Sequence, residues 1–319
     1  MLRIINEIKL SVIIPCFNEQ EVLLTTHDRI TKVLSNCSLM DFEIIYVNDG
    51  SKDDTEIILE DIARDNKHVR VLNFSRNFGH QPALLAGLNF SSGDVVAIID
   101  ADLQDPPELI QKFLELWSEG SDVVYGVRRG RKEIFYKVLM YKAFYFFYEK
   151  ISNIETQRDS GDFCIMDRSV VNVIVNLPEK NKFLRGLRAW SGFIQTPFEY
   201  SRDQRQAGDT KYTYSKLFKL ALDGIFNFTT IPLKLIAIFG FVSSLVSFSC
   251  LMVLVFQRIF DFPIFSRYPS DVPGWTSLVF VFLFIGSLQL LFLGIIGEYI
   301  GRIYEEVKAR PPFIIKNTK

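Results

Sequence analysis

The chain reads Val95-Val96-Ala97-Ile98-Ile99-Asp100-Ala101-Asp102-Leu103-Gln104-Asp105 at a point where an apolar run ends in carboxylates. The unbroken run of residues 95–99 is typical of a central parallel strand that is covered on both faces. Asp100 and Asp102 lie two positions apart, so their side chains point the same way on an extended chain. Their oxygens can converge on one hard cation such as Mg²⁺ or Mn²⁺. We predict that Pro106-Pro107-Glu108 opens a helix with Asp105 as its N-cap. The alternative to a metal site is an ordinary strand-to-helix turn that uses aspartate only for capping.

Other short apolar segments also end in polar loops. We predict strands at residues 10–15, 42–48, 69–74 and 122–126 in addition to 95–99, and a Gly-Asp turn at Ser160-Gly161-Asp162 before a further apolar stretch. Alternation of strands and helices predicts an α/β fold with a mostly parallel sheet and helices on both faces. Ligands bind at the carboxyl edge of such a sheet. The polar residues that we expect at this edge are Glu19, Asp49, Arg76, Asp100, Asp102 and Arg128.

Several common classes of site are excluded by the sequence. Neither GxGxxG after the first strand nor GxxxxGK[ST] occurs, so the dinucleotide-binding and P-loop patterns are absent. The net charge of −1 gives no basic excess for nucleic acid. The four cysteines have no metal-binding spacing and indicate no disulfide framework. A metal that bridges two phosphates is the remaining way to hold a nucleotide without a glycine-rich loop.

Two long uncharged runs, residues 235–256 and 272–297, follow the α/β region. About 20 residues suffice to span the hydrocarbon core, so we predict transmembrane helices at about 235–256 and 273–297. Residues 131–151 and 214–230 combine aromatic and basic side chains and predict amphipathic helices at a membrane surface. An ordinary surface helix is the alternative for the first. Two spans place both termini on one side, which the basic C-terminal residues mark as cytoplasmic.

This pattern predicts four parts of a multi-pass protein of the inner, cytoplasmic membrane. They are a cytosolic α/β domain (1–212), a juxtamembrane amphipathic helix (213–232), a membrane domain (233–301) and a cytosolic tail (302–319). Glycines in the spans allow close helix packing or an oligomer interface.

Five motifs taken together resemble those of family 2 glycosyltransferases. They are Ile13-Ile14-Pro15-x-Phe17-Asn18-Glu19, Val47-Asn48-Asp49-Gly50-Ser51, Asn73-x-Ser75-Arg76-Asn77-x-Gly79, Asp100-Ala101-Asp102-Leu103-Gln104-Asp105-Pro106-Pro107-Glu108 and Gly297-Glu298-Tyr299-x-Gly301-Arg302. The combination is most similar to the polyprenyl-phosphate glycosyltransferases, which include dolichol-phosphate mannose synthase and bactoprenol glucosyltransferase. The resemblance covers essentially the whole chain and, together with the glycines of the spans, implies a homo-oligomer, for instance a tetramer. It implies a GT-A domain and an inverting, metal-dependent transfer of a hexosyl group to polyprenyl phosphate, such as undecaprenyl phosphate, for lipopolysaccharide, O-antigen or cell-envelope glycan modification.

The resemblance also implies a role for individual residues. Those around the nucleotide sugar would be Pro15, Phe17, Glu19, Asp49, Arg76, Asp100, Ala101 and Asp102. Asp100, Asp102 and Gln104 would hold Mg²⁺ or Mn²⁺ against the donor diphosphate, while Arg128, Arg205 and Lys211 would face the lipid phosphate, for which the planar arginine fork is well suited.

Asp162 matches the proposed catalytic base of relatives and would act with Asp102. The alternative is that Asp162 orients the acceptor or a basic side chain. A phosphate monoester has a second pKa near ~6 and is already mostly dianionic at neutral pH, so it needs no base.

Alternatives to this function remain open. UDP-glucose is the first candidate donor, and mannose from GDP-mannose, an N-acetylhexosamine or an aminoarabinose are the others. A processive polysaccharide synthase would be expected to carry QxxRW, which Arg188-Ala189-Trp190 does not fit. A non-catalytic membrane partner would have no reason to keep clustered carboxylates that need a cation.

Overall fold

The computed structural model describes residues 3–128, 160–179, 182–201 and 275–319, together with isolated positions between 236 and 259. The chain divides into two compact units. The first comprises Met1–Ala221 and Arg310–Lys319, and the second comprises Leu222–Ala309. The first unit contains the sheet and every described residue of the candidate site.

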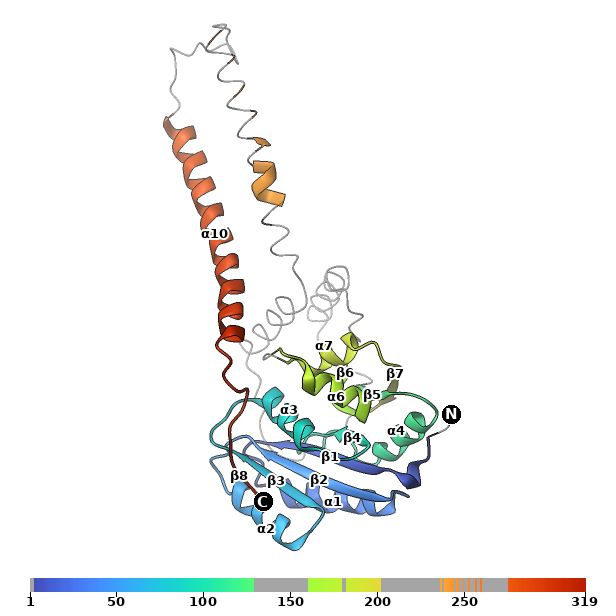
Figure 1. The fold of residues 1–319 in the computed structure, drawn as a ribbon. Coiled ribbons are helices and arrows are strands. Elements are labelled where there is room, and N and C mark those ends of the chain that lie inside the picture. The colour runs from blue at the N-terminus through green and yellow to red at the C-terminus, as the bar shows by residue number, and fades with distance from the viewer. Residues whose placement is uncertain are drawn as a thin grey trace. The chain divides into compact units, whose positions relative to one another are not determined.

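The first unit is built on an eight-stranded sheet with the order β7-β5-β6-β4-β1-β2-β3-β8 (Figure 1). Its strands are β1 (Lys9–Cys16), β2 (Asp41–Asn48), β3 (Val69–Phe74), β4 (Val95–Ile98), β5 (Val123–Arg128), β6 (Ser160–Asp167), β7 (Gln195–Tyr200) and β8 (Ile315–Thr318). β1 pairs in parallel with β2 and β4, β2 with β3, and β5 with β7. β6 is antiparallel to β4 and β5, and β8 is antiparallel to β3. The predicted α/β fold with a mostly parallel sheet is confirmed.

Helices cover both faces of this sheet. The described helical elements of the first unit are the 3-10 helix η1 (Ile5–Glu7), α1 (Leu23–Asn36), α2 (Thr55–Asp65), α3 (His80–Phe90), α4 (Leu109–Ser118), α6 (Arg168–Asn176) and α7 (Leu184–Trp190). α1, α2 and α4 contribute apolar side chains to one core cluster with Val12 and Ile14 of β1. α3 packs on the opposite face, where a Cβ on Gly87 would lie 2.2 Å from Cγ2 of Ile13. His80, the first residue of α3, lies 3.9 Å from Asp100, so this helix begins at the carboxyl edge of the sheet.

Two local predictions were wrong. α4 begins at Leu109, with Glu108 at its N-cap position, so Asp105 does not cap it. Asp105 is buried instead and accepts a hydrogen bond from the hydroxyl of Tyr200 on β7. Residues 160–162 form no turn but begin β6, because pairing with a strand on each side outweighs the local Gly-Asp signal.

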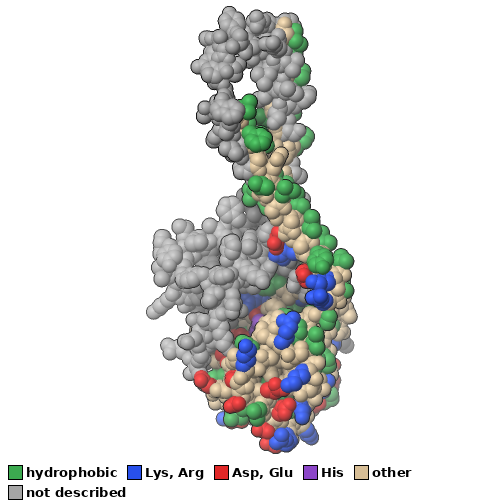
Figure 2. Space-filling model, turned by 90° about the vertical axis from the view of Figure 1, so that its left-hand side faces the viewer, with side chains coloured by type: hydrophobic (Ala, Val, Ile, Leu, Met, Phe, Trp, Pro, Cys, Tyr) green, Lys and Arg blue, Asp and Glu red, His purple; other side chains and the backbone are tan. Residues whose placement is uncertain are grey.

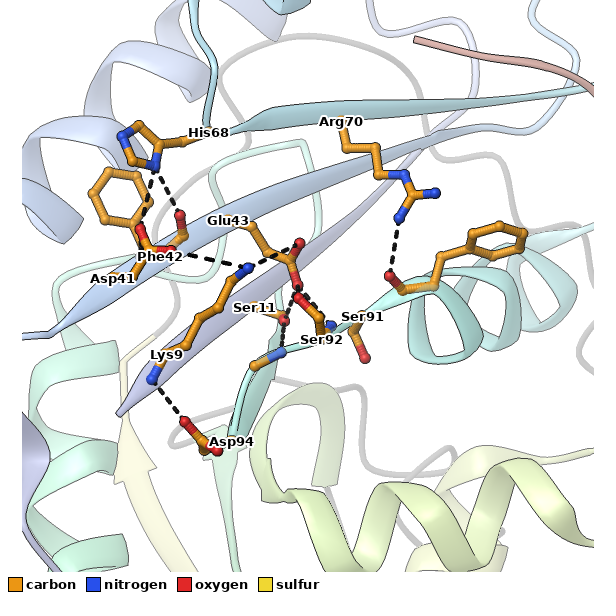
Figure 3. A network of polar contacts seen from close by, with 12 residues as sticks. Lys9, Ser11, Asp41, Phe42, Glu43, His68, Arg70, Ser91, Ser92 and Asp94 are labelled. Carbon is orange, nitrogen blue, oxygen red and sulfur yellow. Dashed lines mark hydrogen bonds and ion pairs between the residues drawn. The ribbon is translucent and has the colours of Figure 1, made fainter. Parts of the chain in front are cut away.

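A polar network ties the amino ends of the central strands together (Figure 3). The carboxylate of Glu43 on β2 accepts hydrogen bonds from Oγ of Ser11, at 2.5 Å, and from the backbone N–H of Ser92, at 2.7 Å. The backbone N–H of Lys9 donates to Asp94 at 2.9 Å. Gly93 lies between them, and a Cβ there would approach the backbone nitrogen of Ser11 to 2.6 Å. The network fixes where β4 starts against β1 and β2, and hence where their carboxyl ends lie.

The described part of the second unit is mainly the 33-residue helix α10 (Trp275–Val307). Hydrophobic side chains are exposed along it, as Figure 2 shows in green. Among the residues that the structure describes, no helix meets the requirement of length and hydropathy for crossing a membrane. The predicted amphipathic segments at 131–151 and 214–230 lie outside the described residues, as does most of the predicted span at 235–256.

Candidate active site

Asp100 and Asp102 follow β4 at the carboxyl edge of the sheet. The side chain of Asp100 is 30% exposed, whereas Asp102 is almost buried and its Oδ1 accepts a hydrogen bond from the backbone N–H of Gln104 at 3.2 Å. Burial and the nearby carboxylates of Asp162, Asp105 and Asp102 raise the pKa of Asp100, against the opposing effect of His80. A cation would relieve this crowding of negative charge.

The chemistry of these donors fits a hard cation. Two carboxylates and the amide of Gln104 supply the oxygen ligands that Mg²⁺ and Mn²⁺ prefer. Among the described residues, no group of three or more His, Cys, Asp or Glu side chains converges as a complete protein metal site.

Asp162 lies at the centre of a cluster that three elements assemble. On β6, its carboxylate receives two parallel hydrogen bonds of 2.7 Å from Nε and Nη2 of Arg185 on α7. Nε2 of His80, the first residue of α3, lies 3.2 Å from Oδ2 of Asp162 and 3.9 Å from Oδ1 of Asp100. The cluster therefore links Asp162 to the predicted metal-binding carboxylates through an imidazole.

The protonation states in this cluster follow from its geometry. Burial alone would raise the pKa of Asp162, but Arg185 and His80 outweigh it and hold this pKa well below its usual value. Burial alone would lower the pKa of His80, but the hydrogen bond to Asp162 and the charges of Asp100 and Asp162 raise it to about 9. At neutral pH the cluster thus holds an ionised carboxylate between two cations. This arrangement favours the orienting role of Asp162 over the role of base.

The loops after β1, β2 and β3 form a second, adjoining part of the site. The carboxylate of Asp49 accepts hydrogen bonds from the backbone N–H groups of Phe78, at 2.7 Å, and Gly79, at 2.9 Å. Gly50 has a φ of +64°, and a Cβ there would lie 2.4 Å from the carbonyl carbon of Arg76. Only glycine permits both the dihedral angle and this approach. Asp49 therefore holds the loop that carries Arg76.

The first loop joins the same assembly. The backbone N–H of Asn18 donates to Oγ of Ser51 at 3.0 Å, and that of Glu19 donates to Oγ1 of Thr55 at 3.0 Å. Pro15 is the second-last residue of β1, and Phe17 is the first residue after this strand. The backbone carbonyl of buried Ala101 accepts a hydrogen bond from Oγ1 of Thr26 at 2.7 Å.

The predicted phosphate-binding residues are described only in part. Arg128 is the last residue of β5 and pairs with Tyr200 of β7. Arg205 and Lys211 lie outside the described residues. The structure thus brings Asp49, Arg76, Asp100, Asp102 and Asp162 to one edge of the sheet and leaves the lipid-phosphate prediction untested.

Sequence reasoning missed His80 and Arg185. A signal existed for His80, which directly follows Gly79 at the end of the loop after β3 and thus begins a helix at the ligand-binding edge. Arg185 lies in a short basic segment with no motif of its own, and only the fold brings it to Asp162.

Comparison with known proteins decides the family. The model of glycosyl transferase family 2 matches residues 11–175, which is more than half of the chain. The chain belongs to glycosyltransferase family 2. It is therefore a glycosyltransferase with a GT-A-like fold, and its matched region includes all the described site residues except Arg185.

Relatives within this glycosyltransferase family align over nearly the full chain. The uncharacterized glycosyltransferase YkcC of Bacillus subtilis (strain 168) is 42% identical over 98% of this chain and 95% of that protein. The bactoprenol glucosyl transferase of Shigella phage SfV is 40% identical over 98% of this chain and 99% of that protein. A solved mannosyltransferase from Pyrobaculum calidifontis, in complex with GDP-Man and Mn²⁺, is 15% identical with a TM-score of 0.48, covering 69% of this chain and 64% of that one.

Proposed function

We propose that this glycosyltransferase transfers a hexosyl group from a nucleotide sugar to polyprenyl phosphate, with UDP-glucose as the donor. The observation that carries this proposal is the juxtaposition of Asp100 and Asp102 with the His80–Asp162–Arg185 cluster. It offers carboxylates for a cation on the donor diphosphate and, beside them, positive charge for an anionic acceptor. The 40% identity to a bactoprenol glucosyl transferase supports the choice of lipid acceptor and of glucose.

In the donor half, Asp100, Asp102 and Gln104 would hold Mg²⁺ or Mn²⁺. The metal would offset the negative charge that develops on the leaving diphosphate. Asp49 fixes the loop of Arg76, whose exposed guanidinium stacks on Phe78 with 4.1 Å between its Cζ and the ring centroid. We assign this loop to the nucleotide.

In the acceptor half, the nucleophile is a phosphate oxygen that attacks the anomeric carbon and inverts it. This anion must approach a second anion, the donor diphosphate. The cations of His80 and Arg185, held by Asp162, reduce that repulsion. Arg128, Arg205 and Lys211 are proposed to bind the lipid phosphate itself.

Attachment to the cytoplasmic membrane is part of this proposal. Exposing a polyprenyl tail to water costs about 0.8 kcal/mol per CH₂, so the phosphate must be met at the bilayer surface. The uncharged runs at 235–256 and 272–297 support two membrane spans, and apolar side chains are exposed along α10. We further propose a homo-oligomer, on the glycines of these runs alone.

Sugar transfer in isolated membranes tests the proposal. UDP-glucose, GDP-mannose and other labelled donors are supplied with Mg²⁺ or Mn²⁺ to membranes that contain wild type, Asp102→Ala or the surface control Asp61→Ala. We expect label from UDP-glucose in an organic-extractable lipid with wild type and Asp61→Ala, and none with Asp102→Ala or with chelator.

Other outcomes of this experiment name the alternatives. Lipid labelled from GDP-mannose would reassign the donor, and a labelled water-soluble polymer would indicate a processive synthase. If no donor is either transferred or hydrolysed, the protein would be a non-catalytic membrane partner.

A further inference from the structure

The segment 310–319, which follows α10, adds the strand β8 (Ile315–Thr318) to the sheet whose strands lead into the Asp49 and Arg76 loops. β8 lies antiparallel to β3 at the sheet edge, in the register Leu72↔Thr318 and Asn73↔Asn317 (Figure 1). The backbone N–H of Ser75, which begins the Arg76 loop, donates to the carbonyl of Ile314 at 3.0 Å. The C-terminal segment 310–319 therefore contacts this loop directly, although it follows α10 in the chain.

An aromatic stack connects this segment to Arg76. The ring of Phe313 stacks on that of Phe74, with 5.3 Å between centroids and 4° between planes. The ring of Phe74 meets that of Phe78 edge-on at 5.7 Å, and the guanidinium of Arg76 lies over Phe78. Phe74 is buried, whereas the three residues after it, 75–77, are exposed to solvent. The aromatic rings therefore support a loop whose other side faces solvent.

A row of asparagines makes a second connection. Asn48, Asn73 and Asn317 are direct partners across β2, β3 and β8. Oδ1 of Asn48 accepts from the backbone N–H of Ser51 at 3.0 Å, and its Nδ2 donates to Oδ1 of Asn73 at 2.9 Å. Among the described residues, the next donor and acceptor in the row, Nδ2 of Asn73 and Oδ1 of Asn317, are buried without a hydrogen-bond partner. A hydrogen bond between these two groups would extend the row into β8.

We propose that Phe313 and Asn317 are positioning residues of the donor-nucleotide site. Phe313 supports the Arg76 loop through Phe74 and Phe78, and Asn317 occupies the next position in the asparagine row, which continues to the loop that follows β2. The inference rests on the proposed function, because that assigns the Arg76 loop to the nucleotide. The segment after α10 is then a component of the donor site as well as a terminal tail.

The same strand offers a matched control. Lys316 alternates away from Asn317 along β8, is 57% exposed in its side chain, and forms an ion pair with Glu56 on α2 at 3.0 Å. Its replacement by alanine removes an attachment of the strand without touching the aromatic stack or the asparagine row.

The test compares full-length wild type, Phe313→Ala, Phe313→Leu, Phe313→Tyr, Asn317→Ala and Lys316→Ala. Three quantities are measured: KM and kcat for UDP-glucose with polyprenyl phosphate and Mn²⁺, the Kd of UDP and of GDP by calorimetry, and Tm. We expect Phe313→Ala to raise both KM for UDP-glucose and Kd for UDP about tenfold while kcat stays within about twofold of wild type. Asn317→Ala should act in the same direction, and Phe313→Tyr and Lys316→Ala should match wild type.

A purely structural role of β8 would give a different result. It would lower Tm and the active fraction while KM and Kd stayed at their wild-type values, and this would overturn the inference. Phe313→Leu keeps most of the buried volume, so it provides the same comparison if the alanine variant does not fold. Wild type that binds UDP or GDP but labels no lipid would overturn the proposed acceptor alone, and wild type that binds neither nucleotide would overturn the proposed function.

Discussion

At the scale of single residues, the neighbours of Asp162 decide what this carboxylate can do. An isolated aspartate at the edge of a sheet could accept a proton from an incoming nucleophile. Both oxygens of Asp162 instead receive hydrogen bonds from Arg185, and one also contacts His80. Its pKa is held well below the usual value, so it stays ionised and is a weak base at neutral pH.

Asp162→Asn separates the two roles. The amide cannot hold Arg185 and His80 as the carboxylate does, so we expect a loss of transfer activity of about 100-fold. Because the pKa of Asp162 is held well below the assay range, the variant should not recover activity as the pH rises from 6 to 9. Asp162 also helps to raise the pKa of His80, so the variant should lose the His80 cation at a lower pH than wild type and the loss should grow with pH. The rate of sugar transfer is measured across that range, with the surface variant Asp61→Asn as the control. Recovery of Asp162→Asn as the pH rises would show that Asp162 acts as a base.

His80 should make the stability of the first unit depend on pH. Its pKa is raised from 6.5 to about 9, so its stabilising contribution is fully present below pH 6.5 and is lost as the pH rises through about 9. We expect wild type to exceed His80→Gln in Tm at pH 6, and this difference to vanish near pH 10, in the presence of a chelator. The control is His27→Gln, because burial lowers the pKa of His27, against the opposing charge of Asp28, and so shifts it in the direction opposite to that of His80. A difference that is constant with pH would contradict the prediction.

At the scale of elements, α6 shows how a strand end and a helix start share one side chain. Asp167 ends β6 and is the N-cap of α6, where its Oδ1 accepts from the backbone N–H of Ser169 at 2.9 Å. Its Oδ2 accepts from Nε1 of Trp117 on α4 at 3.0 Å. One carboxylate thus joins β6, α6 and α4, and so supports the strand that carries Asp162.

Replacing this cap should destabilise the fold in a pH-dependent way. Loss of an N-cap costs about 1 kcal/mol, and Asp167→Ala also leaves the indole of Trp117 without its acceptor. Burial raises the pKa of Asp167, but the hydrogen bonds from Ser169 and Trp117 and the charge of Arg3 lower it overall. The stabilisation that comes from the charge of Asp167 is therefore present above pH 3.8. It is lost as the pH falls through the lower pKa that Asp167 has in the folded state.

Denaturant unfolding at pH 7, 5 and 3 measures this effect. Asp167→Asn keeps an oxygen acceptor for the cap but no charge, so it serves as the matched variant. The free energy of unfolding of Asp167→Asn should fall below that of wild type by the same amount at pH 7 and pH 5, and by a smaller amount at pH 3. A deficit that grows on acidification would contradict the assigned pKa shift.

At the scale of the whole molecule, the chain leaves the sheet domain for a second unit and then returns. Residues 310–319 belong to the first unit, and Lys316 pairs with Glu56, 260 positions earlier in the sequence. The uncharged runs lie between the two parts of the first unit. A membrane anchor formed by these runs would be connected to the catalytic unit at both of its ends, through the chain before residue 235 and through the chain after residue 297.

Extraction of membranes with alkaline carbonate tests this anchor. Each lysine at the centre of a membrane helix costs about 3 kcal/mol, so Phe282→Lys combined with Ile285→Lys should release the protein into the supernatant. Wild type should remain in the pellet, as should the control that combines Ile300→Lys with Ile303→Lys beyond the uncharged run. Release of wild type itself would argue against membrane spans.

The sequence by itself determined the features that local pattern encodes. The strand at 69–74 was predicted with its observed bounds, the carboxylates Asp100 and Asp102 were placed at the end of a central strand, and the five motifs indicated the family. Hydrophobic periodicity and motif spacing involve residues that are close together in the sequence, so they can be recognised without knowledge of long-range contacts.

Only the tertiary structure decided which distant residues meet. His80 contacts Asp162 across 82 positions, and Tyr200 binds Asp105 across 95, because pairing of β6 and β7 with the rest of the sheet brings them together. β8 is short and polar, with the sequence IKNT, and forms a strand because β3 offers it an edge. Contacts of this kind depend on long-range packing that outweighs local propensity, and they set the charge of Asp162 and the support of the Arg76 loop.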